Sequence, residues 1–289
     1  MPRCTTGALA LAAALALPLG AAPLVLLAPR ALPAQEAPAP ADTSPRSNDP
    51  LFTRADLAVF GGFALATAAA APLDVRVAKR LQNPHAQENR FFRRSAAVVT
   101  RLIEPGGVVV SGTLYAVGRL GGNERMATLG LRSAESLVLA LGTTGLIKGF
   151  AGRARPYMTA DTGARAFGFG RGFAHEEYRS FPSGHTTAAF ALAAALTSQS
   201  AEWCDDCVWY VGPALYGVAT LAGLARMYDN KHWASDVIVG AGIGVFSGLK
   251  VVRYHATHED TRIDQWLLSG SAQVGSGGVG RFRVLILPY

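Results

Sequence analysis

The chain has 289 residues, half of them hydrophobic and 16% charged, with a formal net charge of +7. This length fits one large domain or two small ones, and the charged fraction is well below the roughly 25% of an ordinary soluble domain. The sequence has no basic stripe interleaved with aromatic residues, which argues against nucleic-acid binding. Anionic lipids and phosphorylated substrates remain as explanations of the positive charge.

The N-terminus resembles an export signal. Residues 1–34 begin with a basic residue, continue as an apolar stretch and end in small residues, so cleavage could fall after Ala22 or after Ala34. An uncleaved anchor is the alternative. Residues 35–54 are rich in proline and polar residues and predict a flexible spacer. A helical domain is expected over residues 55–254, followed by a C-terminal extension over 255–289.

Six apolar segments predict an all-α fold, a helical bundle with about six core helices. They lie near residues 56–73, 105–118, 127–147, 186–199, 208–225 and 235–252. Several are shorter than the about 20 apolar residues of a membrane span, and the third carries Arg132 and Glu135, which should face protein rather than lipid. The fifth and sixth most resemble spans. We expect an integral membrane protein, with a soluble exported domain as the alternative.

The segments between and after these helices differ in composition. Residues 74–104 are rich in arginine and could form an amphipathic surface helix. Residues 157–181 are rich in glycine and aromatic residues, which is typical of a loop. Beyond residue 253, Trp266–Val274 and Val279–Leu287 flank a glycine-rich turn, so a short β-hairpin is expected there.

Two cysteines, Cys204 and Cys207, form a Cys-x-x-Cys pair in a connector between helices. Such a pair can be a disulfide, a redox site or half of a metal site. The sequence has no second pair to complete a zinc site, so we interpret these residues as a local clip or as two free thiols.

Three short motifs, far apart in the chain, carry the chemistry. The first runs from Lys148 to Arg155 and Pro156, the second is Pro182-Ser183-Gly184-His185, and the third runs from Arg226 through His232 to Asp236. If the helices alternate in direction, all three motifs lie at the same end of the bundle. Each alone has an ordinary structural explanation, such as a helix cap, a helix stop or a surface contact; the set in this order is the evidence.

The third motif fits a nucleophile. His232 and Asp236 are four residues apart, so a helix beginning near residue 232 would place both on one face. The carboxylate could then accept a hydrogen bond from one imidazole nitrogen, which fixes the tautomer and leaves the other nitrogen for attack.

The second motif fits an anion site and a proton donor. Ser183 suits a helix N-cap, and Gly184 lets the backbone approach a ligand closely. The first amides of the following helix would then point at an anion, and His185 in that first turn could give a proton to a departing oxygen.

Basic residues from the first and third motifs complete the expected site. Lys148, Arg155 and Arg226 are cations that could hold phosphate oxygens and stabilise charge in a transition state, and Arg153 is a further candidate. The sequence shows no carboxylate cluster suited to magnesium or zinc.

Together the motifs resemble those of the type 2 phosphatidic acid phosphatase superfamily, which includes vanadium haloperoxidases and bacterial acid phosphatases. The family pattern is Lys-x6-Arg-Pro, Pro-Ser-Gly-His and Ser-Arg-x5-His-x3-Asp. The match is complete except that Ala225 stands in place of the serine, and it covers roughly residues 105–252.

This resemblance implies a metal-independent phosphoric ester hydrolase. His232 would form a phosphohistidine, Asp236 would orient it, and His185 would protonate the leaving group. Lys148, Arg155, Ser183, Gly184 and Arg226 would bind the phosphate. The expected substrate is a phosphomonoester or diphosphate, either of a lipid or isoprenoid or of a small soluble molecule. No cofactor and no metal are expected, and vanadate would inhibit.

Two other functions are compatible with the same motifs, because one fold hosts several chemistries. A vanadate-dependent haloperoxidase would bind vanadate as cofactor in this pocket. A non-catalytic phosphate- or lipid-binding envelope protein would keep the fold, but the intact His185, His232 and Asp236 argue against it.

The resemblance also implies a bacterial envelope protein, in the inner membrane with the site facing the periplasm. The topology gives a less simple picture, because a cleaved signal followed by six spans would put the motifs inside, and the positive-inside rule places the arginine-rich connector there too. Segment 56–73 could pack without spanning, or the whole domain could be a soluble periplasmic one.

Overall fold

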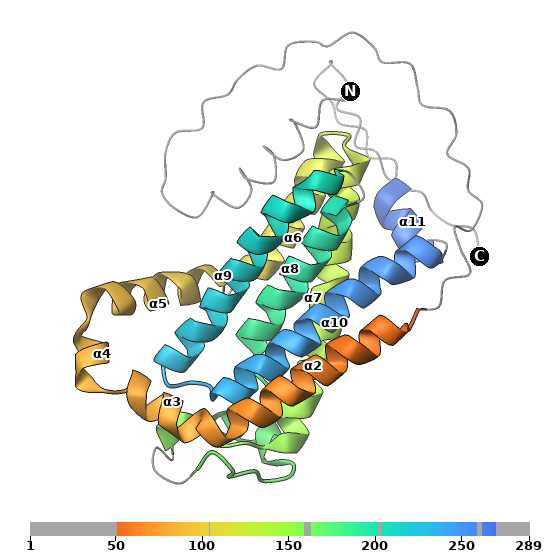
Figure 1. Ribbon diagram of the computed structural model, residues 1–289. Coiled ribbons are helices and arrows are strands. Elements are labelled where there is room, and N and C mark those ends of the chain that lie inside the picture. Colours follow the sequence, from red (N-terminus) through yellow and green to blue (C-terminus); the bar gives the residue numbers. More distant parts are fainter. Residues whose placement is uncertain (1–50, 104, 159–162, 202–203, 259–261, 270–289) are drawn as a thin grey trace.

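The computed structural model describes residues 51–103, 105–158, 163–201, 204–258 and 262–269. Within them the chain forms a helical bundle, which confirms the all-α prediction (Figure 1). The longer helices are α2 (Arg54–Ala70), α5 (Arg90–Ile103), α6 (Gly106–Leu120), α7 (Glu124–Ala151), α8 (Gly184–Ala201), α9 (Val208–Tyr228) and α10 (Ala234–Thr257). The shorter ones are η1 (Ala71–Leu73), α3 (Asp74–Leu81), α4 (Pro84–Glu88), η2 (Pro156–Met158), η3 (Arg171–Phe173), η4 (Glu176–Tyr178), η5 (Asp205–Cys207) and α11 (Arg262–Ser269).

All six predicted apolar segments are helices, namely α2, α6, α7, α8, α9 and α10. Helix α8 is the centre of the bundle and packs against α7, α9 and α10, while α2 lies along the outside of α10 (Figure 1). The arginine-rich connector 74–104 is helical as expected, but it consists of three helices, α3, α4 and α5, rather than one.

Helices α8 and α10 approach closely because α10 carries glycine at every fourth position, at Gly240, Gly244 and Gly248. A Cβ atom on Gly244 would lie 2.4 Å from the carbonyl oxygen of Thr187, and one on Gly248 would lie 2.7 Å from that of Ala191. Any side chain there would force the helices apart. Small residues at such spacing are typical of closely packed helices in membranes.

Three helices are long and apolar enough to cross a membrane, by length and composition. They are Arg54–Leu81, Val208–Tyr228 and Ala234–Thr257, and the bent pair Arg90–Arg101 with Gly106–Leu120 would be a fourth. The first of these is almost entirely exposed in the bundle and carries apolar side chains outward, which suits lipid. The expectation of a membrane protein is therefore supported, and α9 and α10 qualify as spans, as predicted.

Helix α7 does not qualify as a span, and its residues Arg132 and Glu135 face protein, as expected. Arg132 is buried and lies 3.1 Å from Glu135 and 3.4 Å from Asp264 of α11. The hydroxyl group of Tyr115 donates to the carbonyl oxygen of Leu267, so α11 is held against both α6 and α7.

This docking corrects one prediction. The first strand of the expected hairpin was to begin at Trp266, but residues 262–269 form helix α11. Buried ionic and carbonyl contacts to α6 and α7 fix the helical form, and such long-range contacts override a local strand pattern. The rest of the predicted hairpin, the export signal and most of the spacer lie outside the described residues.

Cys204 and Cys207 are joined by a disulfide, with Cα atoms 5.2 Å apart, in the connector between α8 and α9. The disulfide confirms the interpretation of this pair as a local clip rather than as two free thiols. The connector lies at the end of the bundle opposite to the three motifs (Figure 1).

Candidate functional site

The three motifs meet at one end of the bundle, as the alternation of helix directions predicted. Lys148 lies in the last turn of α7 and Arg226 in the last turn of α9, whereas Gly184 begins α8 and Asp236 lies in the first turn of α10. The starts of α8 and α10 are joined directly, because the amide of Ser183 donates to the carbonyl oxygen of Asp236 at 3.0 Å.

His232 is buried and lies two residues before α10, which begins at Ala234 rather than near residue 232. Its Nδ1 atom lies 2.7 Å from the carbonyl oxygen of Ser180 and 3.7 Å from Oδ2 of Asp236. A carbonyl oxygen can only accept, so Nδ1 carries the proton and Nε2 keeps its lone pair. The expected tautomer is therefore present, but the partner that sets it is Ser180 rather than Asp236.

The electrostatics of the site keep this imidazole neutral. Burial lowers the pKa of His232 to about 3; Lys148 and Arg226 act in the same direction, and Asp236 opposes them. The ring is therefore uncharged at physiological pH. A neutral ring with one nitrogen unprotonated is what nucleophilic attack requires.

Asp236 is fully buried and organises the residues around His232. Its carboxylate accepts from the amide of Trp233 at 2.9 Å, from the hydroxyl of Ser180 at 2.5 Å and from Nη1 of Arg153 at 2.5 Å. The first of these caps α10, since Asp236 is the third residue of that helix. Asp236 therefore holds Ser180, and through Ser180 the imidazole of His232.

Arg153 is not a phosphate-binding arm, which corrects the sequence-based expectation. It is buried, and besides Asp236 it donates to Asp74 at 2.7 Å, to the hydroxyl of Ser235 at 2.7 Å and to the carbonyl oxygen of Ala164 at 2.5 and 2.9 Å. A guanidinium group engaged in this way serves the structure of the site rather than a ligand.

Asp74 is a component of the site that the sequence did not reveal. It is buried at the start of α3, accepts from Nη2 of Arg153, and also accepts from the amide of Ser235 at 2.9 Å and its hydroxyl at 2.5 Å. The sequence offered only a weak indication of this role, because Asp74 is a single acidic residue after an apolar segment. If such a residue is buried, it needs a partner for its charge.

The phosphate-binding candidates line up along the same end. Nζ of Lys148 donates to the carbonyl oxygen of Arg179 at 2.7 Å, and its Cε atom would lie 3.6 Å from a Cβ atom on Gly184. Burial lowers the pKa of Lys148 to about 7, and the charge of Arg155 adds to this effect. Lys148 is thus a cation near its titration point at neutral pH.

The two arginines of the motifs sit at the edges of this region. Nε of Arg155 donates to the carbonyl oxygen of Glu176 at 3.0 Å, and its Nη2 lies 3.4 Å from the exposed carboxylate of the same residue. Arg226 is buried, with Nη1 at 3.9 Å from Asp229. Both lie near enough to change the pKa of a neighbouring group. Arg155 lowers the pKa of Lys148, and Arg226 lowers that of His232.

The second motif opens α8 as predicted. The carbonyl oxygen of Ser183 accepts from the amide of Thr187 at 2.9 Å, which is the N-cap position, and its hydroxyl accepts from the side chain of Thr186 at 2.9 Å. His185 is half-buried in the first turn of α8. Ser183, Gly184 and His185 thus lie at the start of α8, as predicted.

The connector between α7 and α8 contains the predicted loop, and its described residues include three short 3-10 helices, η2, η3 and η4. It folds back over the first motif: the amide of Ala154 donates to Ala166, that of Arg155 to Glu177, and that of Ser180 to Arg153. These bonds fix Ser180 where it meets His232. The loop therefore builds the site as well as covering it.

Two other features of the described residues lie away from this site. Glu135, His255 and Asp264 place possible metal ligands within 4.8 Å of one another, which sequence reasoning did not find because they are distant in the chain. Arg132 donates to Glu135 at 3.1 Å and lies 3.0 Å from Nε2 of His255, so a cation already occupies this cluster, near the other end of α7 and α10.

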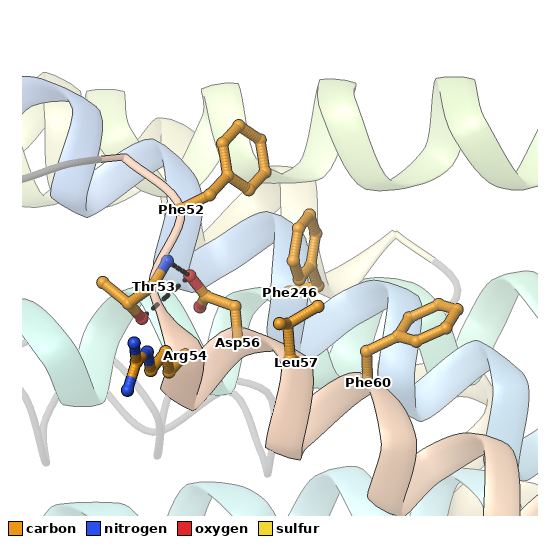
Figure 2. Close-up of a pocket in the computed structure, with 7 residues that line it drawn as sticks. All are labelled: Phe52, Thr53, Arg54, Asp56, Leu57, Phe60 and Phe246. Atoms are coloured by element: carbon orange, nitrogen blue, oxygen red, sulfur yellow. Dashed lines mark hydrogen bonds between the residues drawn. The ribbon is translucent and has the colours of Figure 1, made fainter.

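The second feature is an apolar hollow of about 440 Å³ between α2 and α10, lined by residues that include Phe52, Leu57, Phe60 and Phe246 (Figure 2). Phe246 is ten residues beyond Asp236, about 15 Å along the helix. None of the residues of the three motifs lines this hollow, so it is not the candidate site.

Comparison with known proteins agrees with this geometry. The family model described as the PAP2 superfamily matches residues 129–260, a segment that contains every residue of the three motifs. Residues 129–260 therefore belong to the PAP2 superfamily. The resemblance inferred from the motifs is confirmed, and Asp74 lies outside the matched PAP2 segment.

Two curated relatives are similar to parts of this chain. The lipid A 1-phosphatase of Porphyromonas gingivalis is 45% identical over 69 residues, which are 24% of this chain and 15% of that protein. The lipid A 1-phosphatase of Rhizobium johnstonii is 33% identical over 104 residues, which are 36% of this chain and 38% of that protein. The match thus spans well under half of either relative.

One solved structure is similar over more of the chain. It is the crystal structure of a transmembrane PAP2-type phosphatidylglycerolphosphate phosphatase from Bacillus subtilis, with 19% identity, coverage of 72% of this chain and 98% of that chain, and a TM-score of 0.47.

The buried bridge generates a prediction about stability. Replacing Arg153 with methionine leaves the carboxylates of Asp74 and Asp236 without their shared cation, and breaking a buried ion pair costs about 3–5 kcal/mol. We expect the Arg153→Met protein in detergent to unfold at a clearly lower temperature. Arg165→Met, which removes an exposed arginine from the same connector, is the control. Equal melting temperatures for the two variants would contradict the role given to Arg153.

Proposed function

We propose that this protein is a phosphatase that hydrolyses a phosphate ester of a lipid through a phosphohistidine intermediate. The observation that carries the proposal is the buried, neutral His232, whose Nδ1 proton is held by Ser180 and which lies among the cations Lys148 and Arg226. The two curated relatives are both lipid A 1-phosphatases by name, which supports a lipid substrate.

The proposed reaction has two steps. Nε2 of His232 attacks phosphorus, the bond to the leaving oxygen breaks, and His185 gives its proton to that oxygen. Water then attacks the phosphohistidine while His185 takes a proton from it, releasing phosphate and restoring both imidazoles. Lys148, Arg155 and Arg226 stabilise the charge on the phosphoryl oxygens, with the amides at the start of α8.

The nucleophile is tested by replacement. His232→Ala should abolish hydrolysis of an aryl phosphate and of a lipid phosphate, because the variant lacks the imidazole nitrogen that attacks phosphorus. Rapid acid-free quenching of the wild-type protein with ³²P-labelled substrate should trap an alkali-stable phosphoprotein that the variant lacks. Wild-type-like turnover by a folded His232→Ala protein would refute the assignment.

The lowered pKa of Lys148 predicts the pH dependence. A lysine loses its charge as the pH rises through its pKa, so phosphate binding, and with it kcat/KM, should fall above about pH 7. His232, with a pKa of about 3, should add no limb between pH 4 and neutrality.

The lysine is identified by the conservative variant. Lys148→Arg keeps a cation at all pH values of interest, so the alkaline limb of its kcat/KM profile should move to higher pH. A limb in the same place in both proteins would assign it to another group and overturn this prediction.

Metal independence is a further part of the proposal, and no cofactor is included in it. Activity should survive dialysis against EDTA, and vanadate should inhibit, since it mimics the five-coordinate transition state of phosphoryl transfer. Loss of activity with chelator, restored by a divalent metal, would require a different mechanism. A gain of halide oxidation with vanadate and peroxide would identify a haloperoxidase instead.

We also propose that the site faces the periplasm of a bacterial envelope, as the resemblance of the motifs to the phosphatidic acid phosphatase superfamily implies. Two observations favour the opposite orientation. The arginine-rich connector 74–104 begins at the site end, and the Cys204–Cys207 disulfide, a bond typical of oxidising compartments, is at the other end.

Cysteine labelling distinguishes the orientations. In a chain with its native cysteines replaced by serine, Glu176→Cys at the site end should react with a membrane-impermeant maleimide in intact spheroplasts. Trp209→Cys at the far end should react only after permeabilisation; both side chains are exposed. The reverse pattern would place the site in the cytoplasm, and labelling at both positions would indicate a soluble exported domain.

A further inference from the structure

A group of phenylalanine rings is exposed beside the candidate site. Phe169 is 85% exposed, Phe173 57% and Phe150 49%. The ring of Phe150 contacts the other two, with centroids 5.6 Å from that of Phe169 and 5.0 Å from that of Phe173. We call these three residues the phenylalanine cluster. Contiguous apolar surface of this kind marks a place where something apolar binds.

The cluster shares its backbone with a phosphate-binding residue. Phe150 is two residues beyond Lys148 in α7, and the ring of Phe173 lies over Gly149, where a Cβ atom would be only 2.2 Å from it. The connector that carries Phe169 and Phe173 also supplies the carbonyl oxygen of Arg179 to the Lys148 ammonium group. A molecule whose phosphate reached Lys148 would therefore pass close to these rings.

The surroundings of the cluster suit a lipid rather than another protein. The connector that carries Phe169 and Phe173 also carries two exposed arginines, Arg165 and Arg171, and the guanidinium group of Arg171 lies over the ring of Tyr178 at 4.4 Å. Aromatic and arginine side chains together are typical of the membrane–water interface, where rings meet hydrocarbon and cations meet anionic headgroups. The candidate spans α9 and α10 meet at this same end of the bundle, so the cluster lies where spans emerge.

We propose that the phenylalanine cluster is the docking surface for a hydrocarbon chain of the substrate lipid, next to the cations that hold its phosphate. This inference rests on the proposed function and names the element that would give preference for lipid phosphates over soluble ones. The rings contact the chain and take no part in the chemistry, so they set substrate affinity rather than the rate of phosphoryl transfer.

Kinetics with two substrates test this role. Phe169→Ser should lower kcat/KM about tenfold for a long-chain lipid phosphate in mixed micelles, mostly through KM, because contact between the ring and the chain is lost. It should leave kcat/KM for a soluble aryl phosphate unchanged. Phe91→Ser, which removes a similarly exposed ring from α5, is the matched control and should change neither value. An equal loss on both substrates, or no loss on the lipid, would overturn the proposal.

A binding measurement separates this inference from the proposed function. In the His232→Ala background, Phe169→Trp should introduce fluorescence that a lipid phosphate with brominated chains quenches more strongly than a brominated phosphatidylcholine at equal mole fraction. Phe91→Trp should show no such difference. Absence of selective quenching at position 169 would refute the docking surface, even if the wild-type protein is an active phosphatase. Selective quenching would support it even if hydrolysis of lipid phosphates were never observed.

Discussion

The candidate site depends on one buried guanidinium group. Arg153 joins the carboxylate of Asp74, at the start of α3, to that of Asp236, at the start of α10, and it also holds the connector through the carbonyl oxygen of Ala164. Burying three charges is costly, and it is tolerated only when the geometry satisfies them all. Parts of the chain that are far apart in sequence are thereby fixed in one arrangement, and His232 is positioned within it.

The basic residues of this arrangement have different partners. Arg153 neutralises the buried carboxylates of Asp74 and Asp236. In contrast, Lys148 and Arg226 lower the pKa of His232, and Arg155 lowers that of Lys148. The imidazole of His232 is oriented by the backbone carbonyl group of Ser180, and the hydroxyl group of Ser180 donates in turn to the carboxylate of Asp236. Burial and the surrounding cations then keep the ring neutral.

Much of this could be predicted from the sequence. Apolar segments located the six main helices because each must bury a face, and the spacing of the motifs placed the eventual site residues at one end. The roles of Arg153, Ser180 and Asp74 could not be predicted, since they depend on contacts between residues 52 to 161 positions apart. The strand expected at Trp266 was wrong for the same reason, because local pattern carries no information about docking against α6 and α7. The export signal, most of the spacer and the remaining part of the hairpin stay predictions.

The glycine positions of α10 have a consequence for how rigidly the candidate site is held. With backbone packed against backbone, α8 and α10 cannot slide or tilt independently without a steric clash. His185 in the first turn of α8 and His232 just before α10 are therefore carried by two helices whose relative position is set by backbone contact.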